Sequence, residues 1–370
     1  MSIEPHYRGD VPAGAAAAAA GGDHIETDVS RDRGAIPFRD NEPQPCASRA
    51  VVATSPALDP SIEIVVCIPS FRRPQHLRLT LESLAAQETG RRFAVVIVEN
   101  DAAACASVPV AAEFLASGNL SGLCLVEPRQ GNCQAINAAF ETALSTFPFA
   151  SSLLMIDDDE IASSDWLESM LRAAETTGAD IVGGPVFPDF DDDMKRGWGR
   201  HPAFRPGYDV SGPVPVIYGC GNCLIRRPVF AALGLPAFDL RFNFLGGGDY
   251  DFFLRCRHAG FRFHWAAEAV IVETVPASRT NVGWLARRGL RIGAINYHVQ
   301  RKAARTVWSR SVLIARMLAI LPLSLFRAAR LMLSERKAVV AMHPMTVAAG
   351  SWLAVVGIEP KPYQASKIIS

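Results

Sequence analysis

The segment Ser152-Leu153-Leu154-Met155-Ile156-Asp157-Asp158-Asp159-Glu160 joins an apolar run directly to four consecutive acids. A stretch with helical character, residues 164–177, follows it. A buried strand that ends in carboxylates before a helix is typical of open α/β sheets, which bind ligands beyond the carboxyl ends of their strands. The segment therefore predicts a ligand site at one edge of such a sheet.

The four acids favour a divalent metal ion, because like charges this close repel one another unless a cation lies between them. Oxygen ligands suit Mg²⁺ or Mn²⁺, and such an ion is usually shared between one or two carboxylates and substrate phosphates. The alternative is a solvated acidic turn. Since the acids follow a buried strand, we favour a site for a metal ion and a diphosphate.

The amino-terminal half alternates strands with helices. Apolar, β-branched runs predict the strands, and the segments between them have helical spacing, as with Leu77, Leu81 and Leu84 after Pro74. This alternation predicts a doubly wound, mixed α/β sheet. The predicted strands cover residues 62–69, 93–98, 122–126, 152–156 and 179–184.

Composition divides the 370 residues into three parts. Residues 1–60 mix Ala, Gly, Pro and charge without periodicity, which predicts a disordered leader. Residues 61–300 carry the strand–helix pattern, and residues 301–370 form a basic and apolar helical extension. Within the second part, residues 186–215 are rich in Pro, Gly, Asp and aromatic residues, which predicts a mobile loop over the site. We interpret the acids of that loop, Asp189 and residues 191–193, as solvated.

Cysteine usage and the first residues predict a cytoplasmic protein. The eight cysteines are scattered, and only Cys220 and Cys223 have the spacing of a redox or zinc pair. No second pair completes a zinc site, so we favour buried thiols. Residues 13–20 lack the basic start and Leu-rich centre of a secretory signal.

The zero net charge of the chain hides a basic segment. Residues 279–337 contain thirteen Lys or Arg and one acid, which gives this segment a charge of +12. Its interleaved apolar residues favour an anionic membrane surface over nucleic acid. Residues 312–333 are interrupted by Arg316, Pro322, Arg327 and Arg330 and predict an amphipathic helix in the headgroup region. Residues 338–358 hold no Asp, Glu, Lys or Arg and predict a re-entrant or packed helix, with a membrane span as the alternative.

Two other strand ends carry polar side chains, Glu99-Asn100-Asp101 and residues 129–132. Because parallel strands end at the same edge, these groups are expected to meet the acids of residues 157–160. A nucleotide would fit across this edge, with its base at the first strands and its diphosphate at the metal. Further on, glycines 246–248 precede Asp249 at the start of an apolar helix, where the helix terminus stabilises a carboxylate. A helix cap is the alternative role for Asp249.

Taken together, these motifs resemble the family-2 glycosyltransferases, which have the nucleotide-sugar-binding fold called GT-A. The resemblance covers residues 62–300 and rests on the order of the motifs. The segments 68–74 and 284–293 look most like bacterial exopolysaccharide transferases of the succinoglycan type. The motifs are Ile68-Pro69-Ser70-Phe71-Arg72-Arg73-Pro74, Val98-Glu99-Asn100-Asp101, Gly131 with Ala135-Ile136-Asn137-Ala138-Ala139, Ile156-Asp157-Asp158-Asp159-Glu160, residues 219–227 and residues 246–254.

The resemblance implies a role for each matching residue. It implies that Asp159 binds the metal and that Asp249 is the catalytic base. Gly248 stands where the family has a Glu before this base, and Glu273 stands near the place of a late metal-binding His. Glu273 is either a ligand or structural. The donor site would include Ser70 and Glu99 at the base, Asp157 at the ribose, and also Arg72, Asp101, Asn137 and Asp158.

The implied reaction is transfer of one sugar, with inversion, from a nucleotide sugar, with UDP favoured by resemblance. The acceptor would be a glycan or a lipid-linked glycan at the inner face of the cell membrane. Arg287, Arg288 and Arg291, and also Asp251, are candidates to contact the acceptor or the phosphates, with a solvated helix face as the alternative for the arginines. No Gln-x-x-Arg-Trp segment occurs, which favours a single addition over processive synthesis.

Two other functions remain possible from the sequence. A sugar-1-phosphate nucleotidyltransferase would need a glycine-rich basic loop after the first strand, and residues 71–74 contain no glycine. A catalytically impaired binding protein would explain Gly248, but retention of Asp157, Asp159 and Asp249 argues against it.

Overall fold

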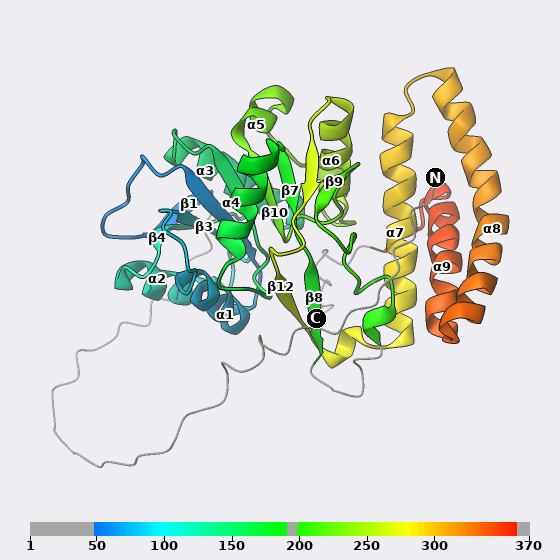
Figure 1. Cartoon of the computed structure of the whole chain (residues 1–370), viewed down its shortest axis with the longest axis horizontal. Helices are drawn as coiled ribbons and strands as arrows, with labels where there is room; N and C mark the ends of the chain where they lie inside the picture. The colour runs from blue at the N-terminus through cyan, green and yellow to red at the C-terminus, as the bar shows by residue number, and fades with distance from the viewer. Residues whose placement is uncertain (1–47, 191–197, 361–370) are drawn as a thin grey trace, which may run out of the picture.

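The computed structural model describes residues 48–190 and 198–360 (Figure 1). Its centre is a nine-stranded sheet in the order β1-β4-β3-β2-β5-β10-β7-β11-β9. β4, β3, β2 and β5 run parallel, whereas β1 and β10 are antiparallel to their neighbours, so the predicted mixed α/β sheet is confirmed. The strands are β1 (Ala50–Thr54), β2 (Ile64–Ser70), β3 (Ala94–Glu99), β4 (Ser121–Val126), β5 (Ser152–Met155), β7 (Ile181–Gly183), β9 (Gly212–Val214), β10 (Cys223–Arg226) and β11 (Phe263–Trp265).

Helices cover both faces of this sheet (Figure 1). In β2, Val66 and Ile68 face one layer while Val65 and Cys67 face the other, as the two-residue period of a strand requires. Each fully buried aliphatic side chain contributes roughly 1.5–3 kcal/mol to folding. The first layer consists of α1 (Pro74–Ala85), α2 (Val108–Ser117) and α4 (Trp166–Thr177), and the second of α3 (Asn132–Thr146), α5 (Arg227–Leu233) and α6 (Gly248–His258).

A second sheet of three strands joins β6 (Glu160–Ala162), β12 (Ile271–Val275) and β8 (Val186–Phe190). The prediction of a loop over residues 186–215 was wrong for β8 and for β9, because their partners β12 and β11 lie far along the chain and local composition cannot reveal them. Asp189 is exposed in β8, and residues 191–193 lie outside the described part of the chain.

The described structure also begins before the predicted boundary at residue 61. β1 pairs with β4 at the edge of the sheet, and Arg49 forms ion pairs of 2.7 Å with Glu127 and 2.6 Å with Glu141. Val51 and Val52 of this edge strand are exposed, so no buried apolar run marks it in the sequence. Residues 1–47 of the predicted leader lie outside the described residues.

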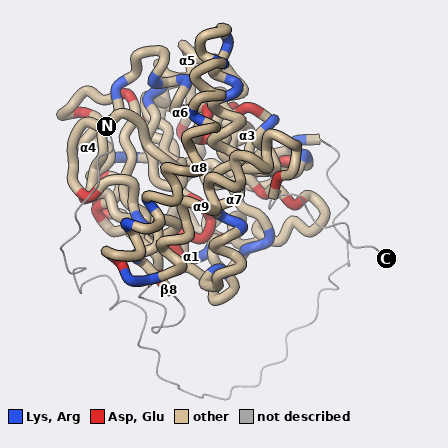
Figure 2. Tube along the Cα trace, turned by 90° about the vertical axis from the view of Figure 1, so that its right-hand side faces the viewer, with Lys and Arg blue, Asp and Glu red and all other residues tan. Residues whose placement is uncertain are grey.

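Three helices form a layer beside the sheet: α7 (Val282–Ala303), α8 (Val307–Glu335) and α9 (Ala338–Val355) (Figure 1). α9 packs closely on α7, because a Cβ on Gly293 would overlap the backbone of Val347 and one on Gly350 the backbone of Leu290. α7 crosses the predicted domain boundary at residue 301. Within the described residues, α8 and α9 are each long and apolar enough to cross a membrane. Figure 2 faces this layer and shows both helices largely uncharged.

Candidate active site

The acids after β5 form a turn that neighbouring elements hold in place. The Thr80 hydroxyl of α1 donates to the backbone carbonyl of Glu160 over 2.7 Å. Inside the turn, the backbone N–H of Asp157 donates to the carboxylate of Glu160 over 2.7 Å. A Cβ on Gly221 would lie only 2.5 Å from Glu160 Oε1, so glycine leaves the room that this carboxylate needs. Glu160 therefore shapes the turn, and the other acids are presented at the edge of the sheet.

Asp158 connects this turn to the end of β2. Its Oδ2 accepts hydrogen bonds from the Ser70 hydroxyl over 2.9 Å and from the Phe71 backbone N–H over 3.1 Å. Beyond the end of β3, the next strand, Asp101 forms an ion pair with Arg72. These contacts bring four predicted donor-site residues to the ends of adjacent strands.

Two arginines neutralise Asp159. Arg73 Nη1 lies 2.5 Å from Asp159 Oδ2. Arg279 bridges two acids, with Nη2 3.4 Å from Asp159 Oδ2 and Nη1 2.6 Å from Glu273 Oε1. Glu273 comes from β12, where it pairs opposite Glu160 in the small sheet. The structure therefore brings Glu273 to the acidic turn from more than a hundred residues away in the sequence.

The acids of this cluster raise the pKa of one another. Burial, followed by the charges of Asp159, Asp158 and Glu273, raises the pKa of Asp157 to about 8. Burial and then the charge of Asp159 raise the pKa of Glu273, while Arg279 lowers it. The cluster thus holds more negative charge than its arginines offset, and a further cation would favour the ionised acids.

The cluster fits a metal ion shared with phosphates rather than a complete protein cage. Among the residues that the structure describes, no three His, Cys, Asp or Glu side chains converge as a ready metal site. Mg²⁺ usually takes only one or two carboxylates and completes its shell with water and phosphate oxygens. A hard-oxygen donor set with excess negative charge matches that chemistry.

Asp249 lies in the first turn of α6, where glycines set its position. Gly247 has φ +88°, a left-handed conformation that glycine adopts without strain. The Asp249 carboxylate accepts a hydrogen bond from the Tyr250 backbone N–H over 2.8 Å. Burial raises the pKa of Asp249, while the charge of Arg291 on α7 lowers it. Asp249 is thus a partly buried carboxylate beside a cation from the carboxyl-terminal helices.

Asp249 and the acidic turn lie at the same edge of the sheet. β10 runs antiparallel to β5, so that Cys223 at its start lies opposite Met155 at the end of β5. The charges of Asp249 and Asp157 both raise the pKa of the thiols of Cys220 and Cys223. The two acids, from distant segments, therefore act electrostatically on the same pair of buried thiols.

Comparison with known proteins identifies the family. The sequence profile of glycosyl transferase family 2 matches residues 65–234. The chain is also 35% identical over 237 residues to the succinoglycan biosynthesis protein ExoM of Rhizobium meliloti (strain 1021), which covers 63% of this chain and 72% of that protein. The chain is a family-2 glycosyltransferase.

One solved structure agrees with the fold of this glycosyltransferase. The mannosyltransferase PcManGT from Pyrobaculum calidifontis, solved with GDP-Man and Mn²⁺, has a TM-score of 0.53 at 16% identity, covering 81% of this chain and 90% of that chain. S. aureus TarS 1–349 has a TM-score of 0.48 at 10% identity, covering 80% of this chain and 92% of that chain. The first likeness and the observed sheet confirm the predicted GT-A-type fold.

Two predicted donor-site residues of the transferase form hydrogen bonds with backbone groups. The Glu99 carboxylate accepts hydrogen bonds from the backbone N–H groups of Asp101 and Ser107, each over 2.8 Å. The Asn137 amide donates to the Phe238 carbonyl and accepts from the Phe238 N–H, each over 2.8 Å. Both side chains fix the backbone of segments at this edge of the sheet. Their predicted contacts with the donor stay predictions.

Three of the residues predicted to contact the acceptor or the phosphates differ in their surroundings. Asp251 is buried and binds Lys302 over 2.7 Å at the far end of α7. Arg287 is exposed, whereas the charge of Arg288 lowers the pKa of Glu273. Of these three residues, Arg288 is the one whose charge acts on Glu273 of the acidic cluster, and its guanidinium lies over the Trp284 ring, 5.2 Å from the ring centroid.

Sequence reasoning missed Arg73 and Arg279 as partners of Asp159. Arg73 lies inside the motif of residues 68–74, directly before Pro74, so its position carried a signal. Arg279 begins the basic segment, but nothing in the sequence connects it to an acid far upstream. Its role emerges only when β12 and the 3₁₀ turn Ala277–Arg279 are placed beside the acidic turn.

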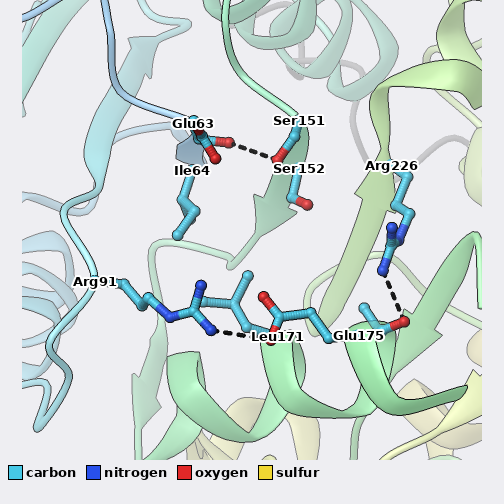
Figure 3. Close-up of a pocket in the computed structure, with 9 residues that line it drawn as sticks. Glu63, Ile64, Arg91, Ser151, Ser152, Leu171, Glu175 and Arg226 are labelled. Carbon is cyan, nitrogen blue, oxygen red and sulfur yellow. Dashed lines mark hydrogen bonds and ion pairs between the residues drawn. The ribbon is translucent and has the colours of Figure 1, made fainter. Parts of the chain in front are cut away.

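A separate polar pocket lies at the opposite edge of the sheet, where β2 and β5 begin (Figure 3). Its lining includes Glu63, Ser151 and an ion pair of 2.9 Å between Arg91 and Glu175. Ligands of open α/β sheets bind at the carboxyl ends of the parallel strands, so this pocket is not the candidate site.

Proposed function

We propose that this transferase moves a single sugar, with inversion, from a nucleotide sugar to a hydroxyl of a glycan or lipid-linked acceptor. We assign it to exopolysaccharide synthesis, because its relative in Rhizobium meliloti is named for succinoglycan biosynthesis. The observation that carries the proposal is that β10 begins opposite the end of β5, and that the charges of both Asp249 and Asp157 raise the pKa of the Cys220 and Cys223 thiols there. A base and a diphosphate site must lie at one edge of the sheet for one sugar to pass between them.

The donor nucleotide would lie across the ends of β3, β2 and β5. Ser70, Arg72 and Asp101 line the ends of the first two strands, which suits the nucleoside, and Asp157 would bind its ribose. Asp158 fixes Ser70 and the Phe71 N–H in place. We favour UDP as the nucleotide because of the resemblance of the motifs.

Asp159 would hold Mg²⁺ or Mn²⁺, with Asp157 and Glu273 beside it. The bound ion supplies Lewis-acid stabilisation of the negative charge on the leaving diphosphate. Arg73 and Arg279 already contact Asp159, so these cations would share phosphate charge, and the charge of Arg288 also acts on Glu273.

Asp249 would act as the base. It accepts the proton of the acceptor hydroxyl while that oxygen forms a bond to the anomeric carbon and the bond from this carbon to the diphosphate breaks. Attack opposite the leaving group inverts the anomeric carbon, so an α-linked donor gives a β-linked product. Proton transfer to a positioned carboxylate is typically worth about 10²–10⁴-fold in rate.

We also propose peripheral contact with the inner face of the cell membrane. α8 exposes apolar side chains along most of its length, including Leu318 at 65% and Phe326 at 69%, and carries Arg316, Arg327 and Arg330. An apolar face with interspersed arginines suits the headgroup region of anionic lipids. A lipid-linked acceptor would meet the enzyme at this surface.

The deciding experiment incubates the full chain with a panel of nucleotide sugars and Mn²⁺ or Mg²⁺, and follows release of nucleoside diphosphate and transfer to lipid extracts. One donor should be consumed, with release dependent on the metal. A chain that binds nucleotide sugars but releases no diphosphate from any of them would instead be the catalytically impaired binding protein.

A further inference from the structure

A pair of tyrosines lies beside Asp249 and takes no part in the proposed chemistry. Tyr218, in the segment before β10, exposes 60% of its surface. Its ring centroid lies 5.8 Å from that of Tyr250, with the two planes tilted by 32°. Tyr250 directly follows Asp249 in the first turn of α6. The exposed ring therefore packs on the residue that follows the proposed base in α6.

The pair has the properties of a binding surface. Tyr250 is half-buried and packs against the main core, so it supports the exposed ring of Tyr218. A tyrosine ring offers a rigid apolar face and a polar hydroxyl, and it binds with little loss of conformational entropy. A sugar ring needs both features, because it has an apolar C–H face and hydroxyl groups at its rim.

The order of the sheet separates this surface from the proposed nucleoside site. The strands run β3, β2, β5, β10, with Ser70 at the end of β2 and Asp159 beyond the end of β5. Tyr218 precedes β10, on the other side of the acidic turn from β3. A nucleobase at the ends of β3 and β2 would not reach it, and the exposed ring of Tyr218 is open to a second substrate.

We propose that Tyr218 and Tyr250 form the subsite for the acceptor sugar, whose ring stacks on Tyr218 and presents a hydroxyl to Asp249. This proposal rests on the proposed function and names where its second substrate binds. It also gives a purpose to an exposed aromatic ring that contributes little to the core.

The surroundings of the pair suit an acceptor that carries a phosphate. The charges of Arg257 on α6 and Arg316 on α8 lower the pKa of Tyr250, against the larger effect of burial. Arg316 is exposed and belongs to the helix with the apolar outer face. A sugar joined to a lipid through a diphosphate would place its ring at the tyrosines and its phosphates near this arginine.

The test uses saturation-transfer difference NMR on the full chain with UDP and the diamagnetic ion Mg²⁺. The probes are the methyl β-glycosides of glucose, galactose, mannose and N-acetylglucosamine. Saturation of the ring protons of at least one probe is expected, with a loss of roughly 3–10-fold in affinity for Tyr218→Ala and recovery in Tyr218→Trp. Phe149→Ala, which removes another aromatic ring exposed by 67%, serves as the matched control and should leave the signal in place.

The outcomes separate this proposal from the function on which it rests. An equal signal in Tyr218→Ala, or no signal from any glycoside, overturns the acceptor subsite. A parallel loss of UDP affinity in Tyr218→Ala also overturns it, because the ring would then serve the donor. If instead UDP fails to bind wild-type protein while the glycosides still respond to Tyr218, the donor assignment fails and the subsite stands.

Discussion

Ile295 of α7 packs directly against Gly247, so that a Cβ on this glycine would overlap the Ile295 side chain. Gly247 lies two residues before Asp249 and has φ +88°. Because α7 is in turn packed on α9, the carboxyl-terminal helices fix the turn that positions the proposed base. The helical layer is therefore part of the active-site architecture as well as a candidate membrane surface.

Gly247→Ala should disturb both folding and catalysis. A left-handed conformation strains alanine, and the added methyl group has no room beside Ile295, so we expect a loss of about 2–4 kcal/mol in the free energy of unfolding. Chemical denaturation measures it. Gly90→Ala, at a site with no atom within 4 Å of the new Cβ, is the control and should be nearly neutral. Equal stability of the two variants would show that the Ile295 contact does not restrain the turn.

Asp249→Asn should retain donor affinity while transfer falls by about 10²–10⁴-fold, because the amide keeps the shape of the side chain but cannot accept the proton. Isothermal titration with UDP and Mn²⁺ measures binding, and a product assay measures transfer. If affinity and transfer fall together, Asp249 has a structural role instead.

Arg291→Leu should move the rising limb of the pH–rate profile to higher pH. A base must be ionised to act, and burial already raises the pKa of Asp249. Arg291 favours the ionised carboxylate, so its removal raises that pKa further and activity requires a higher pH. The measurement is kcat/KM against pH, and Arg287→Leu, at an exposed position of the same helix, is the control. A rising limb that stays in place or moves to lower pH would show that the charge of Arg291 does not favour the ionised Asp249.

Asp159→Ala should abolish the dependence of donor binding on metal. Arg73 and Arg279 lose their shared partner in this variant. We therefore expect a weak residual affinity for UDP that does not depend on metal, because the two arginines can still bind its phosphates. Titration of UDP with and without Mn²⁺, and activity in excess chelator, measure the effect. Full turnover of the wild-type enzyme in chelator, or an unchanged Mn²⁺ titration of the variant, would contradict the metal assignment.

Replacing Leu318 and Phe326 together by Glu should weaken binding to phosphatidylglycerol vesicles by more than about 10-fold. Both side chains are exposed on α8, and burying each in lipid contributes roughly 1.5–3 kcal/mol. Vesicle sedimentation at low and high salt measures it. Leu79→Glu, at a half-exposed position of α1, should bind vesicles like wild type. If wild-type protein does not bind these vesicles at low salt, the proposed membrane contact is wrong.

The local elements of the catalytic domain were largely predictable. β-branched runs that end in acids, and helices that open with Pro74 or close after leucine periodicity, carry their signals within a few residues. The edge strand β1 and the strand β8 were not predictable, because the first exposes its valines and the second depends on pairing with β12. The GT-A resemblance came from the order of several short motifs.

The site was only partly predictable. The acids of residues 157–160 and Asp249 carry local signals, namely a preceding strand and preceding glycines. No local signal shows that the Glu99 carboxylate binds backbone N–H groups or that the Asn137 amide binds the backbone of Phe238. These hydrogen-bond partners depend on the direction in which each side chain points once the chain has folded.

The sequence by itself determined which segments become strands, which strand ends carry carboxylates, and which helices are apolar, since each property follows from residues that are neighbours along the chain. Only the tertiary structure decided that Arg279 joins Glu273 to Asp159, that α7 confines the turn before Asp249, and that Tyr218 rests on Tyr250. These contacts join residues far apart in sequence, and their partners are chosen by the packing of whole helices and sheets.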